Sequence, residues 1–83
     1  MYSVRVSRQA IKDIADLPRD RARQVAEHID QLAEDPRPPG AKKLKGSAAH
    51  RVRVGDYRIL YTIDDAAQLV IVHRVKHRRE AYR

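Results

Sequence analysis

Hydrophobic and polar residues alternate at the start of the chain. Tyr2, Val4 and Val6 occupy every second position, with polar residues between them. Side chains on a strand point alternately to its two faces, so this period of two predicts a strand over Tyr2–Val6 with one buried face. Ser7 comes next, and a serine in this position can cap the helix that follows it.

Two segments with helical spacing follow this strand. Apolar residues recur every three or four positions across Arg8–Leu17 and again across Arg19–Glu34. Pro18 separates the two segments, because a proline interrupts one helix but is well tolerated in the first turn of the next. The pattern predicts two amphipathic helices in a tight helical hairpin, with their apolar stripes facing a common core.

The second half of the chain has the pattern of an antiparallel sheet. The proline-rich segment Asp35–Gly40 predicts a loop. Three apolar or alternating segments predict strands, namely His50–Val54, Tyr57–Ile63 and Leu69–Val75. Gly55 and Asp56 separate the first two of these strands, and glycine suits the first central position of a type II′ turn.

The predicted order of elements is β-α-α-β-β-β. It indicates an α+β fold in which a helical hairpin packs on one face of a small, mainly antiparallel, four-stranded sheet. The chain has 83 residues, 42% of them hydrophobic, and this supports one core of modest size. We therefore expect a single domain over residues 1–83.

The charge of the chain is strongly positive. Lys and Arg number 18 against 11 Asp and Glu, which gives a net charge of +7. Such a surface attracts polyanions, so nucleic acid is the expected partner; the alternative is a basic protein that needs an acidic partner for solubility. The chain has no cysteine and no signal-peptide pattern, and both fit a cytoplasmic protein. No apolar run approaches the roughly 20 residues of a membrane span, so no membrane association is expected.

The predicted hairpin places three arginines on one face of the sheet. A two-residue loop puts Arg53 opposite Arg58, with Arg51 on the same face. The other face, which should meet the helices, carries Val52, Val54, Tyr57, Ile59 and Tyr61. Like charges directly opposite each other are destabilising, and arginine binds phosphate with paired hydrogen bonds. We therefore expect an anion to complete this face, against the alternative of a charged face that is merely solvated.

Other basic residues lie close to these arginines in the sequence. Lys43 and Lys45 belong to the basic segment before the hairpin, and Arg74 and Lys76 belong to the last strand. All four are expected to contact phosphate. The sequence does not fix the register of the last strand, so it leaves open which of its cations join the arginine face.

The histidines do not form a metal site. The four are scattered, cysteine is absent and no pair of carboxylates lies near them, so neither a metal nor a cofactor is expected. His50 is expected to face the helices and His28 to be solvated. His73 shares its strand parity with Leu69, Ile71 and Val75, which favours a core histidine.

Several segments of the second half of the chain together resemble a known family. They are Lys43–Gly46, Arg51–Val54, Asp56–Tyr61 and Val75–Tyr82. In this order they resemble successive blocks of the RelE toxins of the RelE/ParE superfamily. The resemblance implies the RelE fold and a ribosome-dependent endoribonuclease that cuts messenger RNA in the ribosomal A site. It also implies an antitoxin partner, expected to be acidic, that holds the toxin inactive.

The resemblance also implies roles for particular residues. Family members use two basic residues on the second strand, an arginine on the third, and an arginine and a tyrosine near the C-terminus. In this sequence they fall at Arg51, Arg53, Arg58, Arg78 and Tyr82. Attack by the ribose 2′-OH builds negative charge on phosphorus, and fixed cations stabilise that charge without a metal.

The sequence departs from the family at the second strand. The best-studied members carry lysine there, and arginine is a poor general base because it keeps its proton. His77, beside Arg78, is the candidate for this role. Two alternatives remain open: a ParE-like inhibitor of DNA gyrase, and a catalytically weak relative that only binds nucleic acid or antitoxin.

Overall fold

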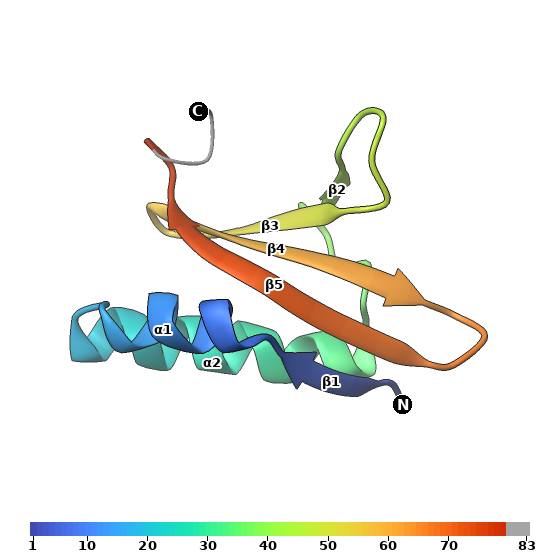
Figure 1. The fold of residues 1–83 in the computed structure, drawn as a ribbon, viewed down its shortest axis with the longest axis horizontal. Helices are drawn as coiled ribbons and strands as arrows, with labels where there is room; N and C mark the ends of the chain where they lie inside the picture. The colour runs from blue at the N-terminus through green and yellow to red at the C-terminus, as the bar shows by residue number, and fades with distance from the viewer. Residues whose placement is uncertain (80–83) are drawn as a thin grey trace.

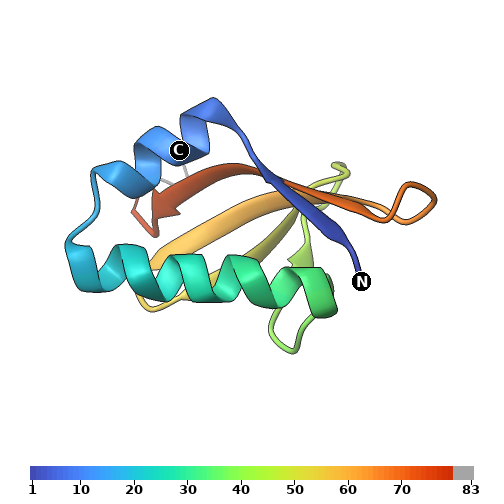
Figure 2. The same cartoon turned by 90° about the horizontal axis from the view of Figure 1, so that it is seen from below.

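Two helices lie against one face of a five-stranded sheet in the computed structural model, which describes residues 1–79 (Figure 1). The elements are β1 (Ser3–Val6), α1 (Arg8–Ala15), α2 (Arg19–Glu34), β2 (Lys42–Lys43), β3 (His50–Val54), β4 (Tyr57–Asp64) and β5 (Leu69–His77). Seen from below, both helices lie in front of the sheet (Figure 2). The predicted α+β fold with a helical hairpin on one face is therefore confirmed.

The sheet has the order β1-β5-β4-β3-β2. β1 runs parallel to β5, and every other neighbouring pair is antiparallel. The structure adds one strand, β2, to the predicted four. Its two residues pair with Arg51 and His50. A pairing this short leaves no periodicity in the sequence, and Lys42 and Lys43 are both exposed, so no apolar pattern marks the strand.

The hairpin between β3 and β4 has the predicted turn. Val54 pairs with Tyr57 across Gly55 and Asp56. Gly55 has φ +60°, whereas Asp56 is not among the residues with positive φ. A type I′ turn needs positive φ at both central positions, so this combination matches a type II′ turn.

The helix α1 takes over the role of a neighbouring strand where β1 ends. Its cap, Ser7, accepts a hydrogen bond from Ala10 N at 3.1 Å and donates its hydroxyl to His73 O at 2.8 Å. Asp13 accepts from Val75 N at 2.9 Å. These side chains satisfy the backbone groups of β5 that β1 is too short to reach.

The core lies between the helices and the sheet. The α2 positions Val25, Ile29 and Leu32 are buried at helical spacing. They belong to one cluster with residues that include Ile59 and Tyr61 of β4. The Tyr61 hydroxyl donates to Pro36 O at 2.8 Å, so this fully buried ring has its polar atom satisfied.

A β-bulge changes the facing of β5. Val70 and Val72 are buried, and so is Val75, so the inward positions change parity at His73. The register shift lies opposite, between Leu60 and Tyr61. The prediction of a core histidine at position 73 was therefore wrong, because one extra residue turns the side chain of His73 to solvent.

Candidate nucleic-acid interface

Three cations form a row across the sheet on the face away from the helices. Arg53 of β3 lies directly opposite Arg58 of β4, and Arg58 lies directly opposite Lys76 of β5. Adjacent strands are about 4.8 Å apart, so three positive side chains occupy a line that spans two strand spacings. We call Arg53, Arg58 and Lys76 the cationic row.

The members of the cationic row differ in exposure. Arg58 is only 2% exposed, although Arg53 is exposed and Lys76 is half-buried. The observed register confirms the predicted pairing of Arg53 with Arg58 and settles that Lys76 joins their face. Burial of a guanidinium beside other cations costs free energy unless an anionic or hydrogen-bonding group lies close to it.

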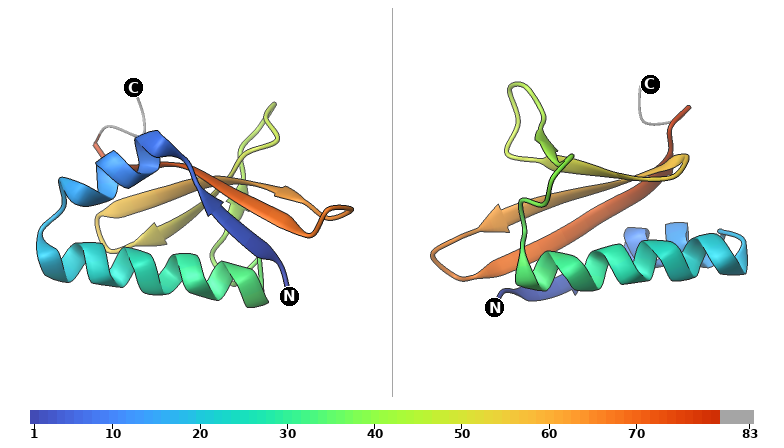
Figure 3. Two further views of the ribbon diagram at one scale, coloured as in Figure 1. Left: turned by 60° about the horizontal axis from the view of Figure 1, so that its bottom comes forward. Right: turned by 180° about the vertical axis from the view of Figure 1, so that it is seen from behind.

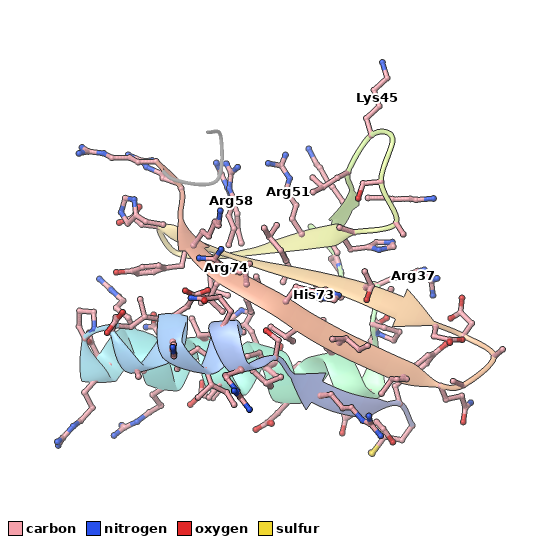
Figure 4. All side chains as sticks on the ribbon, in the orientation of Figure 1. Arg37, Lys45, Arg51, Arg58, His73 and Arg74 are labelled. Carbon is pink, nitrogen blue, oxygen red and sulfur yellow. The ribbon has the colours of Figure 1, made fainter. Side chains whose placement is uncertain are left out.

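Arg51 extends the basic face beside the row. It pairs with Lys42 on one side and with Leu60 on the other. A shallow groove of about 320 Å³ is lined by Gly40, Lys42, Arg51 and Arg53. Figure 4 shows the side chains of Arg51 and Arg58 pointing to the side of the sheet opposite the helices.

Arg74 occupies a different environment from the cationic row. Its Nε lies 2.9 Å and its Nη2 3.3 Å from the two carboxylate oxygens of Asp13. Partial burial opposes ionisation of Asp13, but hydrogen bonds from Arg74, the Val75 N–H and Gln9 prevail and lower its pKa. The structure thus places the predicted phosphate contact Arg74 in an ion pair that fastens α1 to β5.

The loop between β2 and β3 carries Lys45. This loop rises from the sheet on the side away from the helices (Figure 3). Gly46 has φ +72°, a conformation that favours glycine, and the Leu44 N–H donates to Ala49 O at 2.8 Å. Lys45 is exposed in this loop, and Lys43 is exposed in β2, where it pairs with His50 and so lies on the other face from Arg51. Both lysines lie outside the cationic row.

His77 lies on the face that meets the helices. It pairs with Tyr57, and the two rings meet edge to face with centroids 5.4 Å apart. It lines a cavity of about 330 Å³ together with Asp13, Asp16, Leu17, Tyr57 and Val75. The structure therefore does not bring His77 together with the arginines of the opposite face.

Arg78 lies near the turn of the β3–β4 hairpin. The Arg78 N–H donates to Asp56 O at 2.7 Å, and the Arg78 Nε lies 4.0 Å from the Asp56 carboxylate. The Arg78 side chain is exposed beside this turn. Tyr82 lies outside the described residues.

An exposed clasp at the other end of the sheet joins Arg37, Asp65 and Tyr2, and sequence analysis missed it. Arg37 forms a two-point ion pair with Asp65 at 2.9 and 3.1 Å, and the Tyr2 hydroxyl donates to Asp65 at 2.6 Å. The hydrogen bonds from Arg37 and Tyr2 lower the pKa of Asp65 to about 2. Nothing local links these three positions, so only the fold brings them together.

The remaining histidines lie where the sequence predicted. His50 stacks on Tyr61 with ring centroids 5.7 Å apart, and burial, followed by the charge of Arg37, lowers its pKa. His28 lies on α2, half-exposed, with Nδ1 2.9 Å from Gln24 O. Within residues 1–79, no three His, Asp or Glu side chains gather as a metal site requires.

Comparison with known proteins gives consistent matches over nearly the whole chain. The family described as ParE toxin of type II toxin-antitoxin system, parDE, matches residues 4–82. Toxin RelG of Mycobacterium tuberculosis is 36% identical over 86 residues, which cover 99% of this chain and 97% of that protein. No helix within residues 1–79 is both long enough and apolar enough to cross a membrane.

Two solved structures share the fold. The toxin–antitoxin complex RelBE2 of Mycobacterium tuberculosis contains a chain with TM-score 0.83 and 33% identity, covering 92% of this chain and 96% of that one. The archaeal RelE–RelB complex of Pyrococcus horikoshii contains one with TM-score 0.83 and 29% identity, covering 93% and 94%. Both structures hold a toxin together with its antitoxin.

Proposed function

This chain belongs to the ParE toxin family of type II toxin–antitoxin systems, and from that premise we propose that it is a ribosome-dependent endoribonuclease that cuts messenger RNA. The observation that carries the proposal is the cationic row of Arg53, Arg58 and Lys76 on the face of the sheet away from the helices. A row of fixed cations suits a reaction in which charge develops on one phosphate group.

The proposed reaction is attack of a ribose 2′ oxygen on the adjacent phosphorus. The new O–P bond forms as the bond to the 5′ oxygen breaks, so a 2′,3′-cyclic phosphate and a 5′-hydroxyl result. Arg58 and Arg53 hold the phosphate oxygens, because guanidinium groups match two oxygens at once. Arg51, Arg78 and Tyr82 are proposed to complete the contacts to the substrate.

The proton transfers need a group other than arginine. Lysine gives up a proton in proteins far more readily than arginine does. Lys76 is the lysine of the row, and it lies on β5 rather than on the second strand, where the best-studied relatives carry theirs. We propose that Lys76 takes part in proton transfer, whereas His77 faces away from the phosphate site.

The proposed partners follow from the same surface. Lys42 and Arg51 on this face, with Lys45 in the loop beside it and Lys43 at the sheet edge, give the region a charge that attracts RNA, including the RNA of the ribosome. An antitoxin of the RelB type, acidic in the segment that covers this face, is the proposed partner that blocks it. Two relatives of known structure were solved as complexes of a toxin with its antitoxin.

Inhibition of DNA gyrase is the second candidate, because the matching family is described by the name ParE. A paired assay separates the two functions. The purified chain is added to a translation extract with a labelled messenger RNA, and to gyrase with relaxed plasmid. Cleavage of the RNA with full supercoiling activity supports the endoribonuclease. Intact RNA with blocked supercoiling would instead establish the gyrase inhibitor.

A further inference from the structure

The face of the sheet away from the helices carries two large aliphatic side chains that lie outside the core cluster. Leu60 and Thr62 follow Arg58 at every second position of β4, so they share its face. Ile71 lies directly opposite Thr62 on β5. Leu60 and Ile71 are half-buried, and neither belongs to the hydrophobic cluster between sheet and helices.

His73 adds an aromatic ring to this apolar area. The bulge in β5 leaves its side chain exposed, and its Nε2 lies 2.9 Å from Thr62 Oγ1. Because Thr62 belongs to the face away from the helices, this contact holds the imidazole over the same face. Bulges often re-aim a side chain next to a functional site. We call Leu60, Thr62, Ile71 and His73 the imidazole platform.

We propose that the imidazole platform binds one base of a single-stranded RNA, next to the phosphate held by the cationic row. The inference rests on the proposed function, since it takes RNA as the substrate. Unstacked bases are held in proteins by aromatic side chains, histidine among them. Leu60 lies about 7 Å along β4 from Arg58, a distance comparable with the spacing of neighbouring nucleotides in an extended strand.

The charges around the platform favour nucleic acid. Arg51 lies opposite Leu60 on β3, and Arg5 lies opposite Ile71 on β1, so cations flank the apolar area on both sides. Asp64, further along β4, accepts a hydrogen bond from the Ala67 N–H at 3.0 Å and is thereby held toward the turn. A base on the platform thus has cations on either side for its phosphates.

The size of the platform favours a base over a protein. A stable protein interface buries roughly 800 Å² on each partner, far more than four side chains offer. One flat base needs only a patch of this size, and its sugar and phosphates meet polar groups at the rim.

The test is a binding cycle with RNA that cannot be cut. Single-stranded tetranucleotides with every 2′-OH methylated are bound to the wild-type chain at low salt, and a matched series carries one abasic position each. We expect one abasic position to lower affinity about 10-fold, the size of one base stack. His73→Ala should lower affinity for the intact RNA by the same factor and bind that abasic RNA as the wild type does.

Two further variants make the result specific. Ile71→Ser should behave like His73→Ala, whereas Ile11→Ser removes an exposed isoleucine of α1, 57% exposed, and should change nothing. The platform is overturned if the wild type binds none of these RNAs. It is also overturned if the abasic position lowers the affinity of the wild type and of His73→Ala by the same factor. It is also overturned if both variants weaken only the binding of an acidic antitoxin peptide.

Failure of the platform can be distinguished from failure of the proposed function. If the affinity depends on His73 and one base together, but the chain cuts no messenger RNA on ribosomes, the platform is supported and the endoribonuclease activity is refuted. If cleavage depends on Arg58 but the affinity shows no joint dependence on His73 and one base, the endoribonuclease activity is supported and the platform is refuted.

Discussion

The guanidinium of Arg74 and the carboxylate of Asp13 form a two-point ion pair that joins β5 to α1. The same carboxylate accepts the Val75 N–H, so one side chain of α1 replaces the neighbouring strand that β5 lacks at this point. The pair lies one residue from Val75 and two from Lys76. It therefore holds the part of β5 that contributes to the cationic row.

Removal of this carboxylate should weaken the fold. Asp13→Ala removes the carboxylate that accepts hydrogen bonds from Arg74 and the Val75 N–H, and hydrogen bonds to a charged group contribute about 2 kcal/mol. We expect a loss of about that size in the free energy of unfolding, measured by urea denaturation at pH 7. The matched control is Asp30→Ala on the exposed side of α2, which should change stability little. Equal losses in both variants would contradict the role of Asp13.

Acid should weaken the clasp between Asp65, Arg37 and Tyr2. The pKa of Asp65 is about 2 in the folded chain, below the ordinary value for an aspartate. Because the pKa is lower in the folded chain, the ionised Asp65 carboxylate stabilises the fold fully above the pKa of the unfolded chain, near 3.9. This stabilisation is lost as the pH falls through 2. The stability difference between wild type and Asp65→Asn should therefore be largest near neutral pH and shrink between pH 4 and pH 2. A difference that stays constant over this range would rule the clasp out as a pH-dependent contact.

The cationic row should carry the activity. Arg53→Ala and Lys76→Ala each remove one exposed or half-exposed cation, and a single transition-state contact is worth about 10²- to 10³-fold in rate. We expect rates of messenger RNA cleavage to fall by this factor, with unchanged circular dichroism and melting temperature. Arg58→Ala and Arg78→Ala should abolish growth arrest on expression. Arg23→Ala, on an exposed position of α2, is the control that should keep full activity.

His77 should be dispensable for cleavage. It pairs with Tyr57 on the helix-facing side, whereas the cationic row lies on the other side of the sheet. His77→Gln should therefore keep the cleavage rate and its pH profile within about twofold of wild type. A slowed reaction that loses its dependence on pH near neutrality would restore His77 as the general base.

RNA binding should depend steeply on salt. Four cations of this face are proposed to contact phosphates, namely Arg51, Arg53, Arg58 and Lys76. For a single strand, four such contacts give a slope of about −3 in a plot of log affinity against log salt concentration. Lys76→Ala should reduce the magnitude of this slope by about 0.7. A slope near zero would contradict the binding of phosphates to this face.

The sequence predicts the parts of this molecule that depend on local pattern. The two helices, the β3–β4 hairpin and the pairing of Arg53 with Arg58 follow from periodicity and from the turn at Gly55. A turn of two residues fixes the register of its strands, and the register fixes which side chains share a face.

Long-range contacts decide what the sequence does not predict. The bulge at His73 inserts one residue into β5, and no local signal marks it. Arg74 and Lys76 look alike in the sequence, yet Asp13, 61 residues from Arg74, engages only the first of them. The basic strand can therefore be predicted from the sequence, but the sequence does not show which of its cations is structural and which faces the proposed substrate.

The central claim is that this chain cuts messenger RNA on the ribosome with the cationic row. The most direct measurement is primer extension on a defined messenger RNA, incubated with the purified chain with and without ribosomes paused at a known codon. We predict cuts within the A-site codon that appear only with ribosomes and disappear with Arg58→Ala. The absence of cuts in both samples, from a folded chain that still arrests growth, would contradict the claim and favour inhibition of gyrase.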